Sequence, residues 1–338
     1  MKKTRPFSIS PMTAGSARVA ENIRAEVTRV VVGQDALVEL MLLALTARGH
    51  ILLEGVPGLA KSLAAETFAR AVGGDFHRFQ FTPDKLPGDI TGATVYNADR
   101  CGFDYHPGPI FCHLFLADEI NRASPKVQSA LLQAMQERSV DADGHSRPLP
   151  TPFMVLATQN PVEQSGTYPL SEAQTDRFAV KFPVDYPDEA SELTLLERKH
   201  TDFEARKASV SAVADLDTIR ELQRAAQEEI AAGETVRRYI LRLCRATRPD
   251  SGGPDGEALA EFHSFIRLGA SPRAGESLLA LAKARALCEG RNAVDFADVE
   301  VCAPHVFRHR LLLDFSAAAE GITAEVVIER LLDRVPAW

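Results

Sequence analysis

Residues 55–62 read Gly-Val-Pro-Gly-Leu-Ala-Lys-Ser and lie between a short apolar run and a segment with helical periodicity. Glycines let backbone N–H groups approach phosphate oxygens closely, and a helix start adds free donors and a favourable dipole. Lys61 would reach the β- and γ-phosphates of ATP, and the Ser62 hydroxyl would ligate Mg²⁺. The general pattern has glycine before the lysine, where this chain has Ala60. The expected nucleotide contacts are Gly55, Val56, Pro57, Gly58, Leu59, Ala60, Lys61, Ser62 and Leu63.

Two further apolar runs end in polar residues that suit the same chemistry. Asp118 and Glu119 follow the run at 114–117, and Asn160 lies just beyond the run at 153–157. Ligands of α/β folds bind at the carboxyl edge of the sheet, where such residues would lie. Asp118 would hold Mg²⁺ through water, and Glu119 would activate the attacking water as a general base. Asn160 would help to position that water if its strand neighbours the strand of Asp118.

These residues need a sheet to bring them together, and the hydrophobic pattern predicts one. Apolar runs alternate with helical segments up to residue 185, which indicates a parallel sheet covered by helices on both faces. The expected strands are 50–54, 76–81, 114–117, 153–157 and 178–182, and the expected helices are 16–31, 35–47, 59–72 and 126–137. Beyond residue 186 amphipathic helices dominate, at 216–230, 236–247, 278–288 and 324–335. We therefore predict an α/β P-loop core with an αβα parallel sheet over 1–185 and a smaller all-helical lid over 186–338.

Composition narrows the class of protein. The 338 residues carry a formal net charge of −8, which argues against nucleic acid as the main partner. The five cysteines form no CxxC pair, so neither a zinc site nor a disulfide framework is expected. No apolar region follows the first residues as in a signal peptide, and no apolar stretch is long enough to span a bilayer. We expect a cytoplasmic protein without membrane insertion.

Several motifs occur in one order along most of the chain. They read Gly-Val-Pro-Gly-Leu-Ala-Lys-Ser (55–62), Phe-Thr-Pro-Asp-Lys-Leu-Pro-Gly-Asp-Ile-Thr-Gly (81–92), Leu-Ala-Asp-Glu-Ile-Asn-Arg-Ala (116–123), Leu-Ala-Thr-Gln-Asn-Pro (156–161), Gly-Thr-Tyr-Pro-Leu (166–170), Glu-Ala-Gln-Thr-Asp-Arg-Phe (172–178) and Gly-Ala-Ser-Pro-Arg-Ala (269–274). Together they resemble the AAA+ superfamily of ATPases and, within it, the MoxR family. Ala60 before the lysine looks like the MoxR variant of the phosphate loop.

The resemblance implies roles that the residues alone do not show. Asn160 is similar to the sensor-1 residue, and Arg177 to the arginine finger that reaches the γ-phosphate of a neighbouring subunit. Arg273 is similar to the sensor-2 arginine of the lid. The loop that borders the adenine is expected at Val32, Gly33 and Gln34.

The resemblance also implies an assembly and partners. It predicts a homo-oligomer, a hexamer, that acts as a chaperone-like motor on protein clients, including partners with a von Willebrand factor A domain. Two insertions fit the clade that contains the magnesium-chelatase ATPases, at 88–110 and at 138–152. The Asp143-Gly144 pair predicts a β-hairpin in the second. Two ordinary surface loops are the alternative.

Other readings of the chain stay open at this point. A magnesium-chelatase-type motor subunit shares the same motifs, and an ATP-loaded scaffold with negligible turnover would need the same loop. A DNA-dependent ATPase fits the acidic charge poorly. The His305–His309 spacing suits a metal pair, but no third ligand is evident. A stripe of arginines at 238, 242 and 245 suits a solvated helix face or a subunit contact better than nucleic acid.

Overall fold

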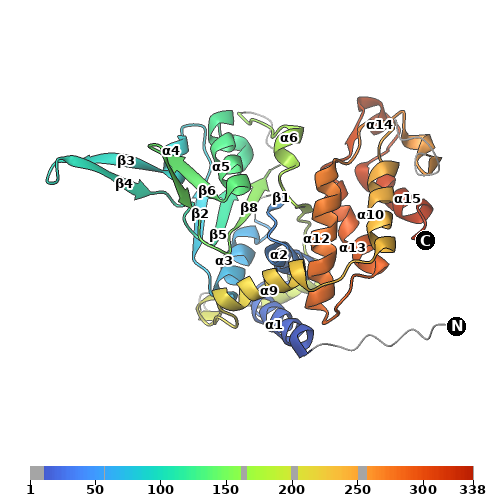
Figure 1. Cartoon of the computed structure of the whole chain (residues 1–338), viewed down its shortest axis with the longest axis horizontal. Coiled ribbons are helices and arrows are strands. Elements are labelled where there is room, and N and C mark those ends of the chain that lie inside the picture. Colours follow the sequence, from blue (N-terminus) through green and yellow to red (C-terminus); the bar gives the residue numbers. More distant parts are fainter. Residues whose placement is uncertain (1–10, 57, 161–165, 199–204, 250–256, 338) are drawn as a thin grey trace. The chain divides into compact units, whose positions relative to one another are not determined.

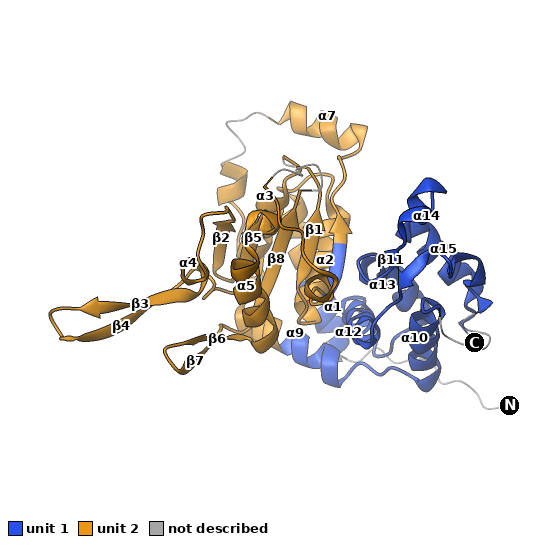
Figure 2. Ribbon diagram, turned by 90° about the horizontal axis from the view of Figure 1, so that it is seen from above, with its two compact units in different colours: residues 1–21, 179–181, 221–338 blue, residues 22–178, 182–220 orange. Residues whose placement is uncertain are grey.

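The computed structural model describes residues 11–56, 58–160, 166–198, 205–249 and 257–337. The chain divides into two units, coloured in Figure 2. The sheet unit comprises residues 22–178 and 182–220, and the helical unit comprises residues 1–21, 179–181 and 221–338. Residues 186–220 thus group with the sheet, whereas the sequence places the domain boundary at 185. The boundary between functional domains stays a prediction.

The sheet unit is built on a five-stranded sheet in the order β2-β5-β8-β1-β9. The strands are β1 (Ile51–Glu54), β2 (Phe76–Gln80), β5 (Leu114–Asp118), β8 (Met154–Gln159) and β9 (Val180–Pro183). The pairs β2/β5, β5/β8 and β8/β1 are parallel. This order confirms the predicted parallel sheet, and it places the strand that precedes Asn160 beside the strand of Asp118.

Helices cover both faces of this sheet. Alternating residues of β5 and β8, such as Phe115 and Val155, pack in one core cluster with Leu131 and Met135 of α5 (Pro125–Glu137). The side chains in between point to the opposite face, because strand residues alternate. There α3 (Lys61–Ala71) contacts β2 and β5, and it also contacts α2 (Asp35–Thr46). The central strands are therefore buried on both sides, as their continuous apolar runs predict.

Both predicted insertions form antiparallel hairpins. The first consists of α4 (Pro87–Thr91), β3 (Gly92–Asn97) and β4 (Gly102–Pro107), and it projects away from the sheet in Figure 1. The second pairs β6 (Ser139–Ala142) with β7 (His145–Pro148). Its two turn residues both have positive φ, 53° at Asp143 and 74° at Gly144, as a type I′ turn requires. The hairpin prediction for 138–152 is confirmed.

The helical unit consists mainly of amphipathic helices. They are α10 (Glu234–Ala246), α12 (Pro272–Cys288), α13 (Phe296–Phe307), α14 (Phe315–Ala319) and α15 (Ala324–Arg334). Two helices run across the division between the units, namely α1 (Pro11–Thr28) and α9 (Leu216–Glu228). The unit also contains a short antiparallel pair, β10 (Ile266–Leu268) with β11 (Leu312–Leu313), which the sequence analysis did not predict. None of the described helices combines the length and the apolar composition needed to cross a bilayer.

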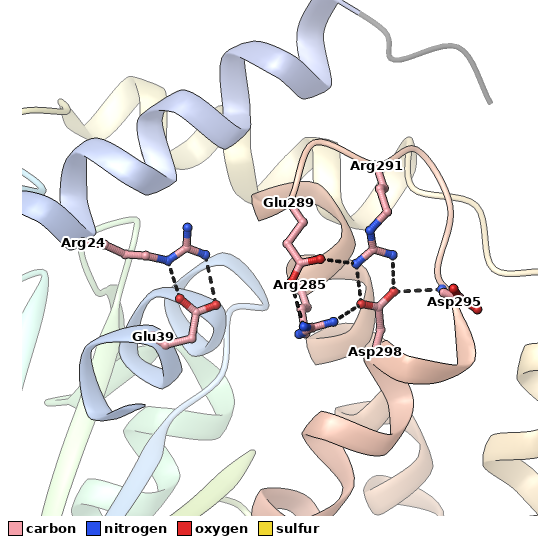
Figure 3. Close-up of polar contacts among 7 residues, drawn as sticks. All are labelled: Arg24, Glu39, Arg285, Glu289, Arg291, Asp295 and Asp298. Carbon is pink, nitrogen blue, oxygen red and sulfur yellow. Dashed lines mark hydrogen bonds and ion pairs between the residues drawn. The ribbon is translucent and has the colours of Figure 1, made fainter. Parts of the chain in front are cut away.

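A buried carboxylate organises the turn between α12 and α13. The Asp298 side chain is 0% exposed, and Arg285 Nη1 and Arg291 Nη1 each donate to it at 2.6 Å. Arg291 Nη2 donates as well, at 2.5 Å, and the backbone N–H of Asp295 adds a fourth donor at 2.8 Å (Figure 3). Burial alone would raise the pKa of Asp298, but the hydrogen bonds from Arg291, Asp295 and Arg285 hold that pKa below its usual value. This cluster fixes the helical unit internally.

Candidate active site

The loop between β1 and α3 takes its shape from three small residues. A Cβ at position 55 would lie 2.6 Å from the carbonyl oxygen of Val184, so only glycine fits there. Gly58 has φ +91°, and a Cβ there would meet nothing within 4 Å. Ala60 precedes α3 with φ 57°, in the left-handed region. That conformation costs a residue with a Cβ about 1 kcal/mol, which explains why glycine is general at this position. Pro57 lies outside the described residues.

Lys61 begins α3 and points back along the loop. Its Nζ donates to the carbonyl oxygen of Gly55 at 2.6 Å. Burial lowers the pKa of the Lys61 ammonium, and the Asp118 and Glu119 carboxylates oppose that shift. The lysine therefore lies over the loop as a cation that is hydrogen-bonded to a neutral carbonyl.

Asp118 ends β5, and its two carboxylate oxygens have different partners. Oδ1 accepts from the Thr158 hydroxyl of β8 at 2.7 Å. Oδ2 accepts from Arg78 of β2, at 3.0 Å from Nε and 2.6 Å from Nη2. Both neighbouring strands therefore hold this carboxylate, which is what the strand order β2-β5-β8 makes possible.

Glu119 has φ 58°, a left-handed backbone conformation that turns the chain sharply after the strand. Its backbone N–H donates to Thr158 Oγ1 at 2.8 Å. Its carboxylate accepts from Gln80 Nε2 at 2.7 Å and lies 3.2 Å from Arg122 Nη1. A non-glycine residue in this region is strained, and such strain gathers at functional sites. Glu119 lines the same cavity as Lys61.

Two adjoining cavities lie along the loop, both wholly within the sheet unit. The smaller, of about 320 Å³, takes in Lys61, Ser62, Asp118, Glu119 and Asn160. The structure thus brings the predicted phosphate, metal and water-positioning residues together. It is lined by Gly55, Gly58, Ala60, Lys61, Ser62, Leu63, Arg78, Gln80, Asp118, Glu119, Thr158, Gln159 and Asn160.

The larger cavity, of about 440 Å³, suits a nucleoside. It shares Gly58, Ala60 and Leu63 with the smaller one, so the two adjoin. Its lining includes Val32, Gln34 and Leu59, together with Val30, Tyr186, Pro187, Glu192, Leu195, Arg198 and Arg206. Gly33 does not line this cavity, and a Cβ added there would come within 2.9 Å of Pro187. Val56 lines neither cavity.

The oxygen donors of the smaller cavity suit magnesium. Mg²⁺ prefers carboxylate and hydroxyl oxygens and keeps much of its shell for water and phosphate. Ser62 and Asp118 supply that donor set across one cavity. Among the described residues no group of three or more His, Cys, Asp or Glu side chains could hold a metal by itself, and this includes His305 and His309.

The two predicted arginines are not among the residues that line the two cavities. Arg177 follows α6 (Glu172–Thr175), is half-buried, and lines neither cavity. Arg273 lies in the first turn of α12, in the helical unit. A finger that acts on a neighbouring subunit need not approach its own site. The roles of both arginines stay predictions.

Four side chains around the two acids were not singled out from the sequence: Arg78, Gln80, Arg122 and Thr158. The sequence contains one indication for two of them. Arg78 and Gln80 are two residues apart at the end of a strand, so their side chains lie on the same face of the sheet. The pairing of Gln80 with Asp118 in register is what makes that face part of the site.

Comparisons with known proteins agree with this geometry. Residues 50–180 match the model of the ATPase family associated with various cellular activities (AAA), and residues 260–331 match the AAA lid domain. A phosphate loop and an Asp-Glu pair on a parallel sheet, followed by a helical unit, define a P-loop ATPase of the AAA class.

Individual relatives narrow the class further. Chaperone MoxR1 of Mycobacterium tuberculosis is 45% identical over 326 residues, which cover 95% of this chain and 83% of that protein. Protein MoxR of Methylorubrum extorquens is 32% identical over 330 residues, covering 94% and 95%. The solved structure of a candidate ATPase from Cytophaga hutchinsonii matches with a TM-score of 0.88 at 40% identity, covering 96% of each chain. The chain belongs to the MoxR family of AAA+ ATPases.

Proposed function

We propose that this protein hydrolyses ATP with Mg²⁺ and couples the turnover to remodelling or maturation of partner proteins, as a chaperone-like motor. The observation that carries the proposal is the Asp118–Glu119 pair facing Lys61 across one cavity, next to a second cavity of nucleoside size. The name of the M. tuberculosis relative, a chaperone, supports the remodelling part. Residues 1–185 would be the nucleotide-binding core and 186–338 the lid.

In this proposal each residue of the smaller cavity has a separate role in hydrolysis. Ser62 and Asp118 would hold Mg²⁺, which when bound neutralises phosphate charge. Lys61 would exchange the Gly55 carbonyl for the β- and γ-phosphates. Glu119 would leave Gln80 and accept a proton from the attacking water, with Asn160 orienting that water. Every side chain that these assignments use is present in the chain.

The proposed assembly is a homo-oligomeric ring, a hexamer, acting in the cytoplasm on protein clients that include a von Willebrand factor A domain partner. Arg177 of one subunit would stabilise the charge on the phosphoryl group held by the next. Arginine fingers in general contribute about 10³-fold or more to the rate. Hydrolysis would then depend on assembly. Glu119 and Arg177, if they act as proposed, argue against an ATP-loaded scaffold without turnover.

The test is ATP hydrolysis measured against protein concentration, for the wild type and for Arg177→Ala. We expect specific activity to rise steeply with concentration and Arg177→Ala to lose activity while it still binds ATP. Arg18→Ala removes an exposed arginine of α1 and serves as the matched control. Activity that is flat with concentration and unchanged in Arg177→Ala would overturn the shared site and the ring mechanism.

A further inference from the structure

Arg78 contacts the carboxylate expected to hold Mg²⁺ but is not among the residues assigned to hydrolysis. Arg78 of β2 grips Asp118 Oδ2 with two nitrogens, Nε at 3.0 Å and Nη2 at 2.6 Å. The other oxygen, Oδ1, accepts from Thr158. Both oxygens of the carboxylate expected to hold Mg²⁺ are therefore in use within the chain. A metal ion or its water shell would therefore share this carboxylate with Arg78, through the acceptor site that remains on Oδ1 or one of those on Oδ2.

The other cations near the cavity have different partners. Lys61 Nζ lies 2.6 Å from the Gly55 carbonyl oxygen, and Arg122 lies 3.2 Å from Glu119 Oε2. In the described part of the chain, the ion pair of Asp118 is made with Arg78. The guanidinium of Arg78 thus supplies positive charge directly beside Asp118.

The two ends of this ion pair differ in accessibility. The Asp118 side chain is 13% exposed, whereas that of Arg78 is 53% exposed. Because β2 is an edge strand, the Arg78 side chain can swing into solvent or toward another partner in the cavity without disturbing the core. Arg78 and a metal ion at the same carboxylate would repel each other, so each weakens the binding of the other to Asp118.

We infer that Arg78 is a counter-ion of Asp118 that competes with Mg²⁺, so that this arginine raises the magnesium concentration at which nucleotide binds tightly. The inference rests on the proposed function, since it takes Asp118 as the metal-binding carboxylate. It assigns Arg78 no contact with the reacting atoms. Arg78 affects the binding of Mg²⁺ at Asp118. Mg²⁺ that is bound to the nucleotide phosphates competes with Arg78 better than free Mg²⁺ does.

The experiment is a magnesium titration of the binding of a fluorescent ADP analogue, which measures affinity without turnover. The proteins are the full-length wild type, Arg78→Gln and Arg78→Lys. Arg70→Gln is the charge-matched control, because Arg70 lies on α3 in an exposed ion pair with Glu66 and lines neither cavity. A melting curve of each protein confirms that it is folded.

We expect Arg78→Gln to lower the magnesium concentration at half-effect by about tenfold, the low end of what a hydrogen bond to a charged group is worth. Arg78→Lys keeps the charge but loses the two-pronged grip, so its midpoint should fall less. Arg70→Gln should match the wild type. A mere structural defect in Arg78→Gln would instead weaken binding with and without metal.

A midpoint that is unchanged or raised in Arg78→Gln overturns the inference while leaving the proposed function intact. If the wild type binds the analogue equally well with and without magnesium, the metal role of Asp118 fails, and the proposed function is then the part that is wrong.

Discussion

Two aspartates, one in each unit, are gripped by arginines in nearly the same way yet lie in opposite environments. Asp298 of the helical unit is 0% exposed and has two arginines and a backbone N–H as donors. Asp118 of the sheet unit lines a cavity, and its single arginine is 53% exposed. The same chemical contact is permanent where solvent is excluded and exchangeable where solvent reaches the partner.

The comparison predicts a division of effects. Substitutions in the Asp118 cavity should change ligand binding and turnover with little change in the free energy of unfolding. Substitutions in the Asp298 cluster should change the free energy of unfolding. Four substitutions would break or sharpen this division, taken from the largest expected effect to the smallest.

Glu119→Gln should reduce ATP hydrolysis by about 10²–10⁴-fold, the range for loss of a general base. Its unfolding midpoint should stay close to that of the wild type, because Glu119 lines a cavity and its arginine partner is partly exposed. The measurements are phosphate release and urea unfolding. Glu137→Gln, at an exposed position at the end of α5, is the control. Full activity in Glu119→Gln would remove the proposed base.

Asp298→Ala should lower the free energy of unfolding by about 3 kcal/mol, the low end for breaking a buried pair, because Arg285 and Arg291 retain some access to water. Urea unfolding followed by circular dichroism measures this. Asp217→Ala removes an exposed carboxylate that pairs with Arg220 on α9 and should change stability by less than about 0.5 kcal/mol. Equal effects of the two substitutions would contradict the division.

His50 adds a pH dependence to the sheet unit. Its ring is buried between Met135 and the backbone of β8, and burial, followed by the charge of Arg138, lowers its pKa to about 3. Its pKa in the unfolded chain is about 6.5. Between these values the unfolded chain binds a proton that the folded chain does not, so stability falls as pH falls through this window. The slope reaches about 1.4 kcal/mol per pH unit.

Urea unfolding at several pH values between 8 and 5 checks this dependence. His50→Gln is expected to be less stable at pH 8 but to lose less on acidification. Parallel curves for His50→Gln and the wild type would show that another group carries the acid sensitivity. His305 of the helical unit, whose pKa burial lowers to about 4, is the alternative source.

Ala60→Gly should raise the free energy of unfolding by less than about 1 kcal/mol. The gain is relief of the left-handed backbone at φ 57°, and the entropy of glycine in the unfolded chain offsets part of it. Ala64→Gly, inside α3, should instead destabilise by about 1 kcal/mol. Thermal melting separates the two, and a destabilising Ala60→Gly would show that the loop gains from its alanine.

The sheet strands and the Asp143-Gly144 hairpin could be predicted because each is specified locally. A continuous apolar run can only be a buried element, and two positive φ angles select a particular turn. The β10–β11 pair could not be predicted, because its strands are too short to show an alternation of polar and apolar residues. The place of Arg78, Gln80 and Thr158 in the site could not be predicted for a different reason. Their contacts depend on which strands are neighbours, and periodicity along one strand carries no information about the next.

The loop from β1 to α3 shows how differently neighbouring positions of one motif tolerate sequence variation. Position 55 is closed to every side chain, because a Cβ would strike the backbone of Val184. Position 58 has open space around it, so its backbone angle alone favours glycine. Position 60 has a comparable angle yet carries a Cβ. Glycine is therefore sterically required at position 55, conformationally favoured at position 58, and replaceable at position 60 for a small loss of stability.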